Sequence, residues 1–233
     1  MWPFSRKQSL LGSGLLRGAT DWHCHILPGV DDGVRTMEEA LEVLAWYAEA
    51  GFREVWLTPH VMEDVPNTPA FLRERFDELK AAYRGPVALH LAAEHMLDNL
   101  FDERLAAGEL LPMGESLLVE TSFFNPPMDL RGILGRIREH GWQPLLAHPE
   151  RYLYMDENDY RDIHASGVAF QLNLPTLTGL YGPEARRRAR FLLREGFYDR
   201  SGTDLHRLKP IRSAVSDRVL PSDTVLRLKQ LMG

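Results

Sequence analysis

Residues 21–33 of the chain read DWHCHILPGVDDG, and the first five of them are expected to end a strand that begins at Ala19. Side chains alternate faces along a strand, so Asp21, His23 and His25 are expected to project from the same face. Two imidazoles on one face at the end of a buried strand can clamp a metal ion, with Asp21 available to orient a ring. An H-x-H pair alone is as typical of structural histidines as of metal ligands, so the rest of the chain must be considered.

Short apolar runs alternate with amphipathic stretches about seven times along the chain, which predicts strands separated by helices. The predicted strands are 19–25, 54–58, 87–93, 116–121, 144–147, 169–174 and 199–203. Several are apolar throughout, as is typical of parallel strands covered on both faces. The alternation indicates βαβ units in an α/β protein, and this number of repeats favours a closed or nearly closed barrel.

Helices are predicted between these strands by capping residues and by apolar spacing. Thr36 and Glu39 form a predicted capping box, and Gly51 lies where the helix that they begin should end. A second helix is expected to begin at Pro69. Further helices are predicted at 130–140, 183–195 and 224–232. The segment 207–223 has the weakest pattern and is expected to be a loop.

The composition is that of an ordinary globular protein. The chain has 233 residues, of which 44% are hydrophobic and 26% charged, and this length suits a single large domain. A formal net charge of −6 gives no support for nucleic-acid binding, which usually requires a basic surface. No stretch approaches the roughly 20 apolar residues of a membrane span, so membrane insertion is not expected.

The cysteine content and the N-terminus favour a cytoplasmic location. Cys24 is the only cysteine, which rules out an intramolecular disulfide and fits a reducing compartment. Arg6 and Lys7 precede several leucines, but small polar residues interrupt that apolar run and no A-x-A-like cleavage site follows. An exported form is therefore not expected.

Every later predicted strand but one is followed by a histidine or a carboxylate. These residues are His60, Glu94, Glu120, His148, Asp204 and His206, and Asp32 lies in the loop after the first strand. The carboxyl ends of parallel barrel strands meet at one face. A single glutamate is usually a surface residue, but several carboxylates gathered at one rim would repel each other without cations. The joint pattern therefore predicts a metal site.

The opening motif resembles that of the PHP (polymerase and histidinol phosphatase) family. The resemblance is greatest to its branch of manganese-dependent protein tyrosine phosphatases tied to bacterial capsular and exopolysaccharide synthesis. The later motifs match in order: Thr58-Pro59-His60, Ala93-Glu94, Val119-Glu120-Thr121, Ala147-His148-Pro149-Glu150-Arg151-Tyr152 and Thr203-Asp204-Leu205-His206. The match covers roughly residues 19–206.

The resemblance implies a single distorted (β/α)7 barrel over residues 19–233, preceded by an N-terminal extension of residues 1–18. It also implies three divalent ions per chain, with manganese expected and iron or zinc as alternatives. The implied ligands are His23, His25, Glu94 and Asp204 for the first ion, Glu94, Glu120 and His148 for the second, and Asp32, His60 and His206 for the third. The residues expected to take part in catalysis are Arg151, His60 and His206.

The chemistry of these side chains agrees with that resemblance independently. Mixed imidazole and carboxylate ligands suit Mn²⁺, Fe or Zn²⁺, and ions about 3.5–4 Å apart can activate a water and clamp phosphoryl oxygens. Arg151 follows His148 by three residues, and its guanidinium could hold a phosphate bidentately. The alternative for Arg151 is an ordinary surface arginine.

Two other features carry less information. Cys24 beside His23 suggests a cysteine phosphatase, but the C-x5-R loop of that class would need an arginine at Val30, so this class is excluded. A basic run at 186–190 lies on a predicted helix. It is interpreted as a solvated helix face, with contact to an acidic partner as the alternative.

The leading hypothesis is a phosphotyrosine-protein phosphatase, acting on a protein substrate such as the tail of a tyrosine kinase. Tyrosinate leaves readily because its pKa is about 10, so a strong general acid is not needed. A second hypothesis is a small-molecule phosphatase of the histidinol-phosphate type, or a phosphodiesterase, on the same barrel. A third is a non-catalytic, metal-stabilised binding module, which would lack one or more ligands, whereas none of the nine is missing. The sequence leaves the oligomeric state open.

Overall fold

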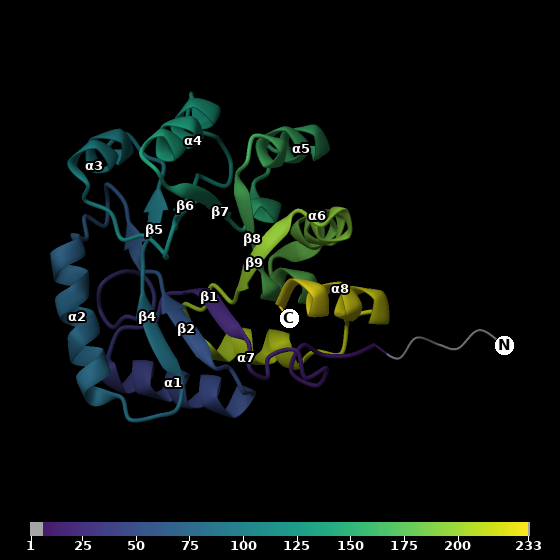
Figure 1. The fold of residues 1–233 in the computed structure, drawn as a ribbon. Coiled ribbons are helices and arrows are strands. Elements are labelled where there is room, and N and C mark those ends of the chain that lie inside the picture. Colours follow the sequence, from purple (N-terminus) through teal and green to yellow (C-terminus); the bar gives the residue numbers. More distant parts are fainter. Residues whose placement is uncertain (1–6, 233) are drawn as a thin grey trace.

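The computed structural model describes residues 7–232, which form an α/β fold in which every pairing between strands is parallel. The strands are β1 Thr20–Cys24, β2 Glu54–Leu57, β3 His60–Val61, β4 Ala88–Leu91, β5 Glu94–Met96, β6 Ser116–Glu120, β7 Gln143–Ala147, β8 Ala169–Asn173 and β9 Tyr198–Gly202. The helices are α1 Met37–Ala50, α2 Pro69–Ala82, α3 Phe101–Ala107, α4 Leu130–Glu139, α5 Glu157–Ala165, α6 Gly182–Glu195, α7 Leu208–Ser216 and α8 Ser222–Met232. Two short 3-10 helices, η1 Pro149–Arg151 and η2 Leu174–Thr178, follow β7 and β8. Figure 1 shows the helices on the outside of the strands.

The strands form a three-stranded sheet in the order β1-β2-β4 and a six-stranded sheet in the order β3-β5-β6-β7-β8-β9. Only two residues separate β2 from β3, and only two separate β4 from β5, so the two sheets share these chain segments. Just beyond the ends of β1 and β9, the backbone N–H of His25 donates to the carbonyl of Leu205 at 2.9 Å. The N–H of Asp204 donates to the carbonyl of His23 at 2.7 Å. The first and last strands are therefore joined beside the predicted ligands.

All seven predicted strands are confirmed, and β3 and β5 are additional short strands at the ends of the second and third. The helix predicted from Thr36 to Gly51 is also confirmed, because Thr36 accepts from the N–H of Glu39 and Gly51 ends α1 with a φ of 94°. The predicted capping box is only half correct: the Glu39 carboxylate accepts from the N–H of Arg35 at 2.9 Å instead of from that of Thr36. Helix α2 begins at Pro69, as predicted.

The prediction of a loop over 207–223 is wrong, because helix α7 occupies residues 208–216 of it. Its buried residues Ile211, Ala214 and Val215 are three or four positions apart and pack on the protein interior. Helices α3 and α5 lie outside the predicted set. Both are short, and each buries only two residues, so little apolar periodicity marks them in the sequence.

Residues 7–18 pack against the rest of the fold. Leu10, Leu15 and Leu16 are buried in the main hydrophobic core, and Gln8 pairs in antiparallel fashion with Leu220 ahead of α8. Within residues 7–232, no helix is both long enough and apolar enough to cross a membrane.

Candidate metal centre

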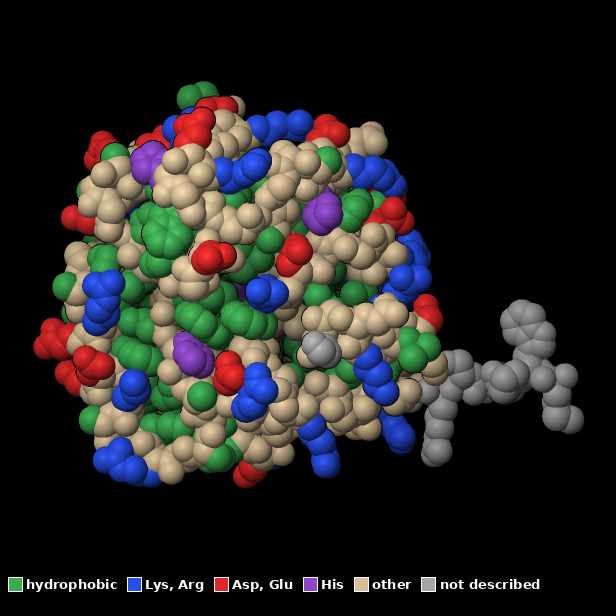
Figure 2. Space-filling view, viewed as in Figure 1, with side chains coloured by type: hydrophobic (Ala, Val, Ile, Leu, Met, Phe, Trp, Pro, Cys, Tyr) green, Lys and Arg blue, Asp and Glu red, His purple; other side chains and the backbone are tan. Residues whose placement is uncertain are grey.

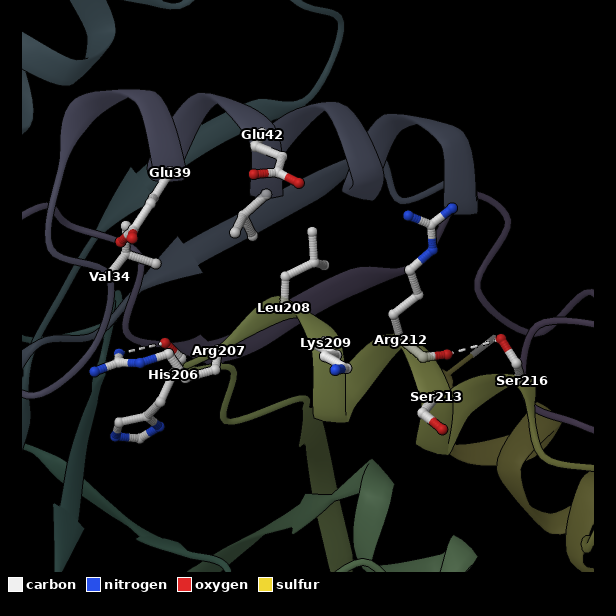
Figure 3. A pocket seen from close by; sticks show the side chains of 11 residues that line it. Val34, Glu39, Glu42, His206, Arg207, Leu208, Lys209, Arg212, Ser213 and Ser216 are labelled. Atoms are coloured by element: carbon white, nitrogen blue, oxygen red, sulfur yellow. Dashed lines mark hydrogen bonds between the residues drawn. The ribbon is translucent and has the colours of Figure 1, made fainter.

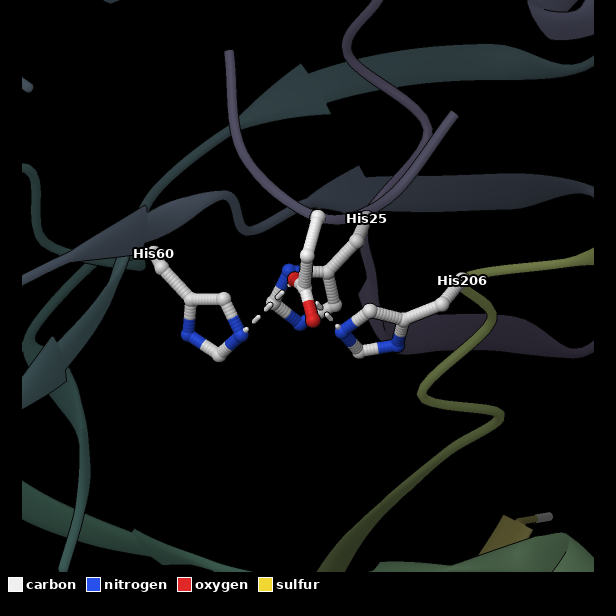
Figure 4. Close-up of side chains that lie close together, drawn as sticks. His25, His60 and His206 are labelled. Carbon is white, nitrogen blue, oxygen red and sulfur yellow. Dashed lines mark ion pairs between the residues drawn. The ribbon is translucent and has the colours of Figure 1, made fainter. Parts of the chain in front are cut away.

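The nine predicted ligands come together at the carboxyl ends of the strands. They form four overlapping groups whose ligand atoms lie within 4.8 Å of one another: His25, Asp32, His60 and His206; His23, His25 and Asp204; His23, Glu94 and His148; and His60, Glu94 and Glu120. Figure 4 shows His25, His60 and His206 reaching toward one point from three separate segments. Glu120 groups with His60, and its Oε2 also lies 3.9 Å from His148 Nε2.

The most enclosed part of the cluster surrounds His23 and His25. Their Nε2 atoms lie 3.0 Å apart, and Glu94 Oε2 lies 3.2 Å from the first and 3.3 Å from the second. Asp204 Oδ1 lies 3.6 and 3.5 Å from the same two nitrogens. All four residues are buried. Two imidazole nitrogens and two carboxylate oxygens therefore face a common point, which is a donor set for a divalent cation.

Hydrogen bonds on the outer side fix the orientation of these two rings. His23 Nδ1 lies 2.9 Å from Gln171 Oε1, and His25 Nδ1 lies 2.9 Å from Asp31 Oδ2. Both partners are acceptors, so each Nδ1 donates its proton outward and each Nε2 faces the cluster.

Asp21 does not orient either ring, which corrects the role expected for it. Its carboxylate accepts from the hydroxyl of Tyr47 at 2.6 Å. It also accepts from the N–H and hydroxyl of Thr203 at 2.8 and 2.6 Å, and from the N–H of His23 at 3.1 Å. Asp21 therefore ties β1 to α1 and to the end of β9, and Asp31 and Gln171 hold the rings.

Several buried polar atoms of the cluster have no hydrogen-bond partner. These are His60 Nδ1, Glu94 Oε2, Glu120 Oε1 and His148 Nδ1. His60 Nδ1 lies 3.1 Å from both Glu94 Oε2 and Glu120 Oε1 without forming a hydrogen bond to either. Buried polar atoms are costly unless they are satisfied. A bound cation would satisfy the carboxylate oxygens, so the residues present fit a metal centre.

Electrostatics in the protein alone shows a demand for positive charge: although burial opposes it, the charges of Glu94 and Asp204 raise the pKa of the His23 imidazole to about 9. Burial, and then the charge of Glu94, raise the pKa of Glu120 to about 7. Burial and the neighbouring Arg151 lower the pKa of His148 to about 4, so this imidazole is neutral at neutral pH, as a metal ligand must be. Bound cations would neutralise the negative charge of carboxylates crowded in this way.

Two of the nine residues have a backbone conformation that is rare for their type. His148 and Asp204, with φ of 33° and 52°, are the only non-glycine residues within 7–232 that have positive φ. Such conformations cost about 1–3 kcal/mol and persist only where the surrounding structure imposes them. His148 directly follows β7, and Asp204 is the second residue after β9. The positive φ therefore occurs where these two segments leave their strands and their side chains join the cluster.

Arg151 is not an ordinary surface arginine, because its side chain is only 18% exposed. It donates to Asp204 Oδ2 at 2.6 Å, and its guanidinium lies 4.3 Å from the ring centres of both Phe123 and Tyr181. It lines a cavity of about 510 Å³ with Asp204 and His206. The arginine is thus held between two aromatic rings at the edge of the cluster.

A second cavity of about 600 Å³ lies between α1 and α7 and shares His206 and Arg207 with the first. Figure 3 shows the side chains of both helices directed into it. Arg207 also donates to the carbonyl of Asp32 at 2.8 Å, so it holds the loop that carries that predicted ligand.

Residues of β8, the strand without a predicted ligand, complete the centre. Gln171 holds His23, and Asn173 Nδ2 donates to Asp204 Oδ2 at 2.9 Å. These two residues were not predicted from the sequence, although polar side chains two apart in a buried strand were a usable signal. No role was predicted for Asp31 either, despite its place in the opening motif.

The other histidines and the cysteine lie outside the four groups, as expected. His95 is buried and its Nε2 accepts from the N–H of Leu111 at 3.3 Å. Cys24 is buried, and its thiol donates to the carbonyl of Trp56 at 3.3 Å.

Known proteins that resemble this chain include members of a described family. Residues 19–216 match the family described as "Capsular polysaccharide synthesis, CpsB/CapC". The tyrosine-protein phosphatase YwqE of Bacillus subtilis (strain 168) is 28% identical over 197 residues, which cover 81% of this chain and 78% of the relative. The tyrosine-protein phosphatase CpsB of Streptococcus pneumoniae is 28% identical over 203 residues, covering 81% and 83%.

Solved structures share the fold. A chain from the crystal structures of YwqE from Bacillus subtilis and CpsB from Streptococcus pneumoniae, described as unique metal-dependent tyrosine phosphatases, superposes with a TM-score of 0.77. It is 24% identical, and the superposition covers 90% of this chain and 85% of that one. The lactonase Lmo2620 of Listeria monocytogenes is more distant, with a TM-score of 0.51, 14% identity, and coverage of 87% and 83%.

Proposed function

Because the chain belongs to the CpsB/CapC family of capsular polysaccharide synthesis, we propose that it is a metal-dependent phosphatase that hydrolyses phosphotyrosine in proteins. The observation that carries the proposal is the convergence of nine imidazole and carboxylate side chains at one rim, with Arg151 beside them. The relatives named tyrosine-protein phosphatases support the choice of substrate. A role in regulating capsule or exopolysaccharide synthesis follows from the same family, and the tail of a tyrosine kinase is the proposed protein substrate.

We further propose that the parallel strands make up one distorted (β/α)7 barrel, with residues 1–18 as an extension before it. The hydrogen bonds between the segments after β1 and β9 support closure at the rim. In such a barrel, side chains from many strand ends can meet at one rim although they are distant in sequence.

The proposed ligands are the nine residues of the four groups, and we propose three ions per chain. His23, His25, Glu94 and Asp204 would hold one ion, and Glu94 with Glu120 and His148 a second. Asp32, His60 and His206 would hold the third. The donor set suits manganese, with iron or zinc as alternatives. When bound, such ions supply an activated water and neutralise charge on phosphoryl oxygens.

The protein's own groups would supply orientation and phosphate binding. Asp31 and Gln171 keep the two histidine rings turned toward the cluster. Arg151, clamped between Phe123 and Tyr181, would donate its planar fork to phosphate oxygens. The ring of Tyr181, which lines the same cavity, also suits a substrate that carries a phenyl ring. A tyrosinate leaving group, with a pKa of about 10, needs little help from a general acid.

A comparison of substrates on metal-loaded protein tests the proposal. We expect kcat/KM for a phosphotyrosine peptide to exceed that for histidinol phosphate and for an aryl phosphodiester by at least about tenfold. A ratio of ten corresponds to about 1.4 kcal/mol of preferential transition-state binding. A higher value for either of the other two would assign the small-molecule or phosphodiesterase function instead. Hydrolysis of none of the three would favour a binding module.

Two histidine variants provide the matched control. His148→Ala should lose metal and activity, because His148 belongs to the cluster. His140→Ala removes an exposed imidazole at the end of α4 and should change neither.

A further inference from the structure

One side of helix α6 forms a groove of about 630 Å³ that is lined by arginines. Arg186, Arg190 and Arg194 are spaced by four residues, so they lie on one face of the helix, and Arg187 lines the same groove. Thr178 at the end of η2, with Gly179 and Pro183, supplies the rest of the wall. No acidic side chain is among the described residues that line it.

Three of the four arginines that line this groove have no acidic partner within residues 7–232. Arg187 and Arg188 pair with Glu184 at 2.7 and 2.9 Å, which agrees with the interpretation of a solvated, salt-bridged face. Arg186, Arg190 and Arg194 form no ion pair anywhere in residues 7–232. The Nε atoms of Arg186 and Arg190 are buried and have no hydrogen-bond partner. Three unpaired guanidiniums in successive turns, in a chain of net charge −6, indicate a partner that supplies negative charge.

The groove and the proposed active-site cavity are lined by residues that are neighbours in the sequence. Leu180 and Tyr181 line the cavity that contains Arg151, and Gly179 and Pro183, on either side of them in the sequence, line the arginine groove. Arg186 and Arg194 are about 12 Å apart along the helix axis, at 1.5 Å per residue. An extended peptide spans that distance with roughly four residues.

Resting on the proposed function, we propose that the arginine groove binds an acidic segment of the substrate protein while its phosphotyrosine occupies the cavity. The segment would carry several aspartate or glutamate residues near the phosphotyrosine. Guanidinium groups bind carboxylates through paired hydrogen bonds, which suits an array of this spacing. A nucleic acid fits less well, because no aromatic side chain on which bases could stack lines the groove. Figure 2 shows Lys and Arg side chains gathered along the edge of the molecule beside α6 and α8.

The test compares two phosphotyrosine peptides of equal length, one with four glutamates beside the phosphotyrosine and one with glutamines in their place. Each peptide is made in two versions, one with these four residues before the phosphotyrosine and one with them after it. On metal-loaded wild-type protein at low salt, we expect kcat/KM for the better acidic peptide to be about tenfold higher, the sum of several modest exposed ion pairs. The preference should fall as salt is added. Equal values for acidic and neutral peptides would overturn the proposal.

Variants of the groove locate the effect. Arg190→Gln/Arg194→Gln should reduce the preference to about twofold or less, and Arg190→Lys/Arg194→Lys should keep most of it, because the charge remains. Arg186 is left intact because its guanidinium also donates to the carbonyl of Val219. Arg131→Gln, which removes an exposed arginine on α4, is the matched control and should leave the preference unchanged. A preference that survives in Arg190→Gln/Arg194→Gln would overturn the proposal.

Binding of a fluorescent acidic peptide that carries unphosphorylated tyrosine separates this proposal from the proposed function. Failure to hydrolyse the neutral phosphotyrosine peptide would contradict the phosphatase activity. Binding that weakens several-fold in Arg190→Gln/Arg194→Gln would still support the groove. Displacement of the fluorescent peptide by a single-stranded oligonucleotide is compared with its displacement by the unlabelled peptide. If the oligonucleotide acts at the lower concentration, the choice of an acidic peptide as partner is overturned.

Discussion

Arg151→Ala is the most informative single change at the proposed site. The guanidinium lies between two aromatic rings and donates to Asp204 at 2.6 Å, so its position is fixed before any substrate binds. A hydrogen bond to a charged group contributes about 1.5–3 kcal/mol, and each 1.4 kcal/mol is a factor of ten in rate. Loss of this donor should therefore lower kcat/KM by about 100-fold, the scale seen when one preorganised donor to a transition state is removed.

The assay is hydrolysis of an aryl phosphate by metal-loaded protein, with metal content measured on the same sample. Metal content should not change in Arg151→Ala, because Asn173 still donates to Asp204 at 2.9 Å. Arg151→Lys should restore only part of the activity, since an ammonium cannot replace the planar fork. His148→Ala should lose both metal and activity. Wild-type kcat/KM in Arg151→Ala would refute the phosphate-binding role.

Three further predictions concern the surroundings of the cluster. Cys24→Ser should keep most of the activity while EDTA abolishes it, because the buried thiol only contacts a backbone carbonyl; an inactive Cys24→Ser with a chelator-resistant wild type would indicate a thiol enzyme. Tyr47→Phe removes the 2.6 Å donor to buried Asp21 and should destabilise the protein by about 1–3 kcal/mol, seen as a fall in Tm of several degrees; an unchanged Tm would contradict this. Gly202→Ala would place a methyl group 2.5 Å from His23 Cβ and should displace that ring, lowering both the metal content and Tm; normal metal content in a stable variant would show that the strand can adjust.

The sequence predicts the strands and the nine clustered residues well because both depend on local pattern. Each predicted strand is a short run of mostly apolar residues, and each candidate ligand stands at its end or in the loop that follows, where a parallel fold brings them together. The weaker result for 207–223 has a physical cause. Helix α7 has no side-chain cap at Arg207, and its Pro210 is the third helical residue instead of the first, so the usual start signals are missing.

Contacts between distant segments could not be predicted from local sequence pattern in the same way. Strand alternation places Asp21 on the face of His23 and His25, but it does not tell which acidic residue meets a ring. In the structure Asp31, six residues beyond His25, bonds that ring, and Asp21 meets Tyr47. The positive φ at His148 is likewise imposed by tertiary packing and leaves no mark in the residue type.

The number of metal ions per chain tests the account most directly. The four overlapping groups of ligand atoms require more than one cation if they function together. Protein purified without chelator, or reconstituted with Mn²⁺ or Zn²⁺ and freed of excess metal, should contain more than one ion per chain, and three when fully loaded. A content of one ion or fewer per chain after reconstitution would contradict the multinuclear centre.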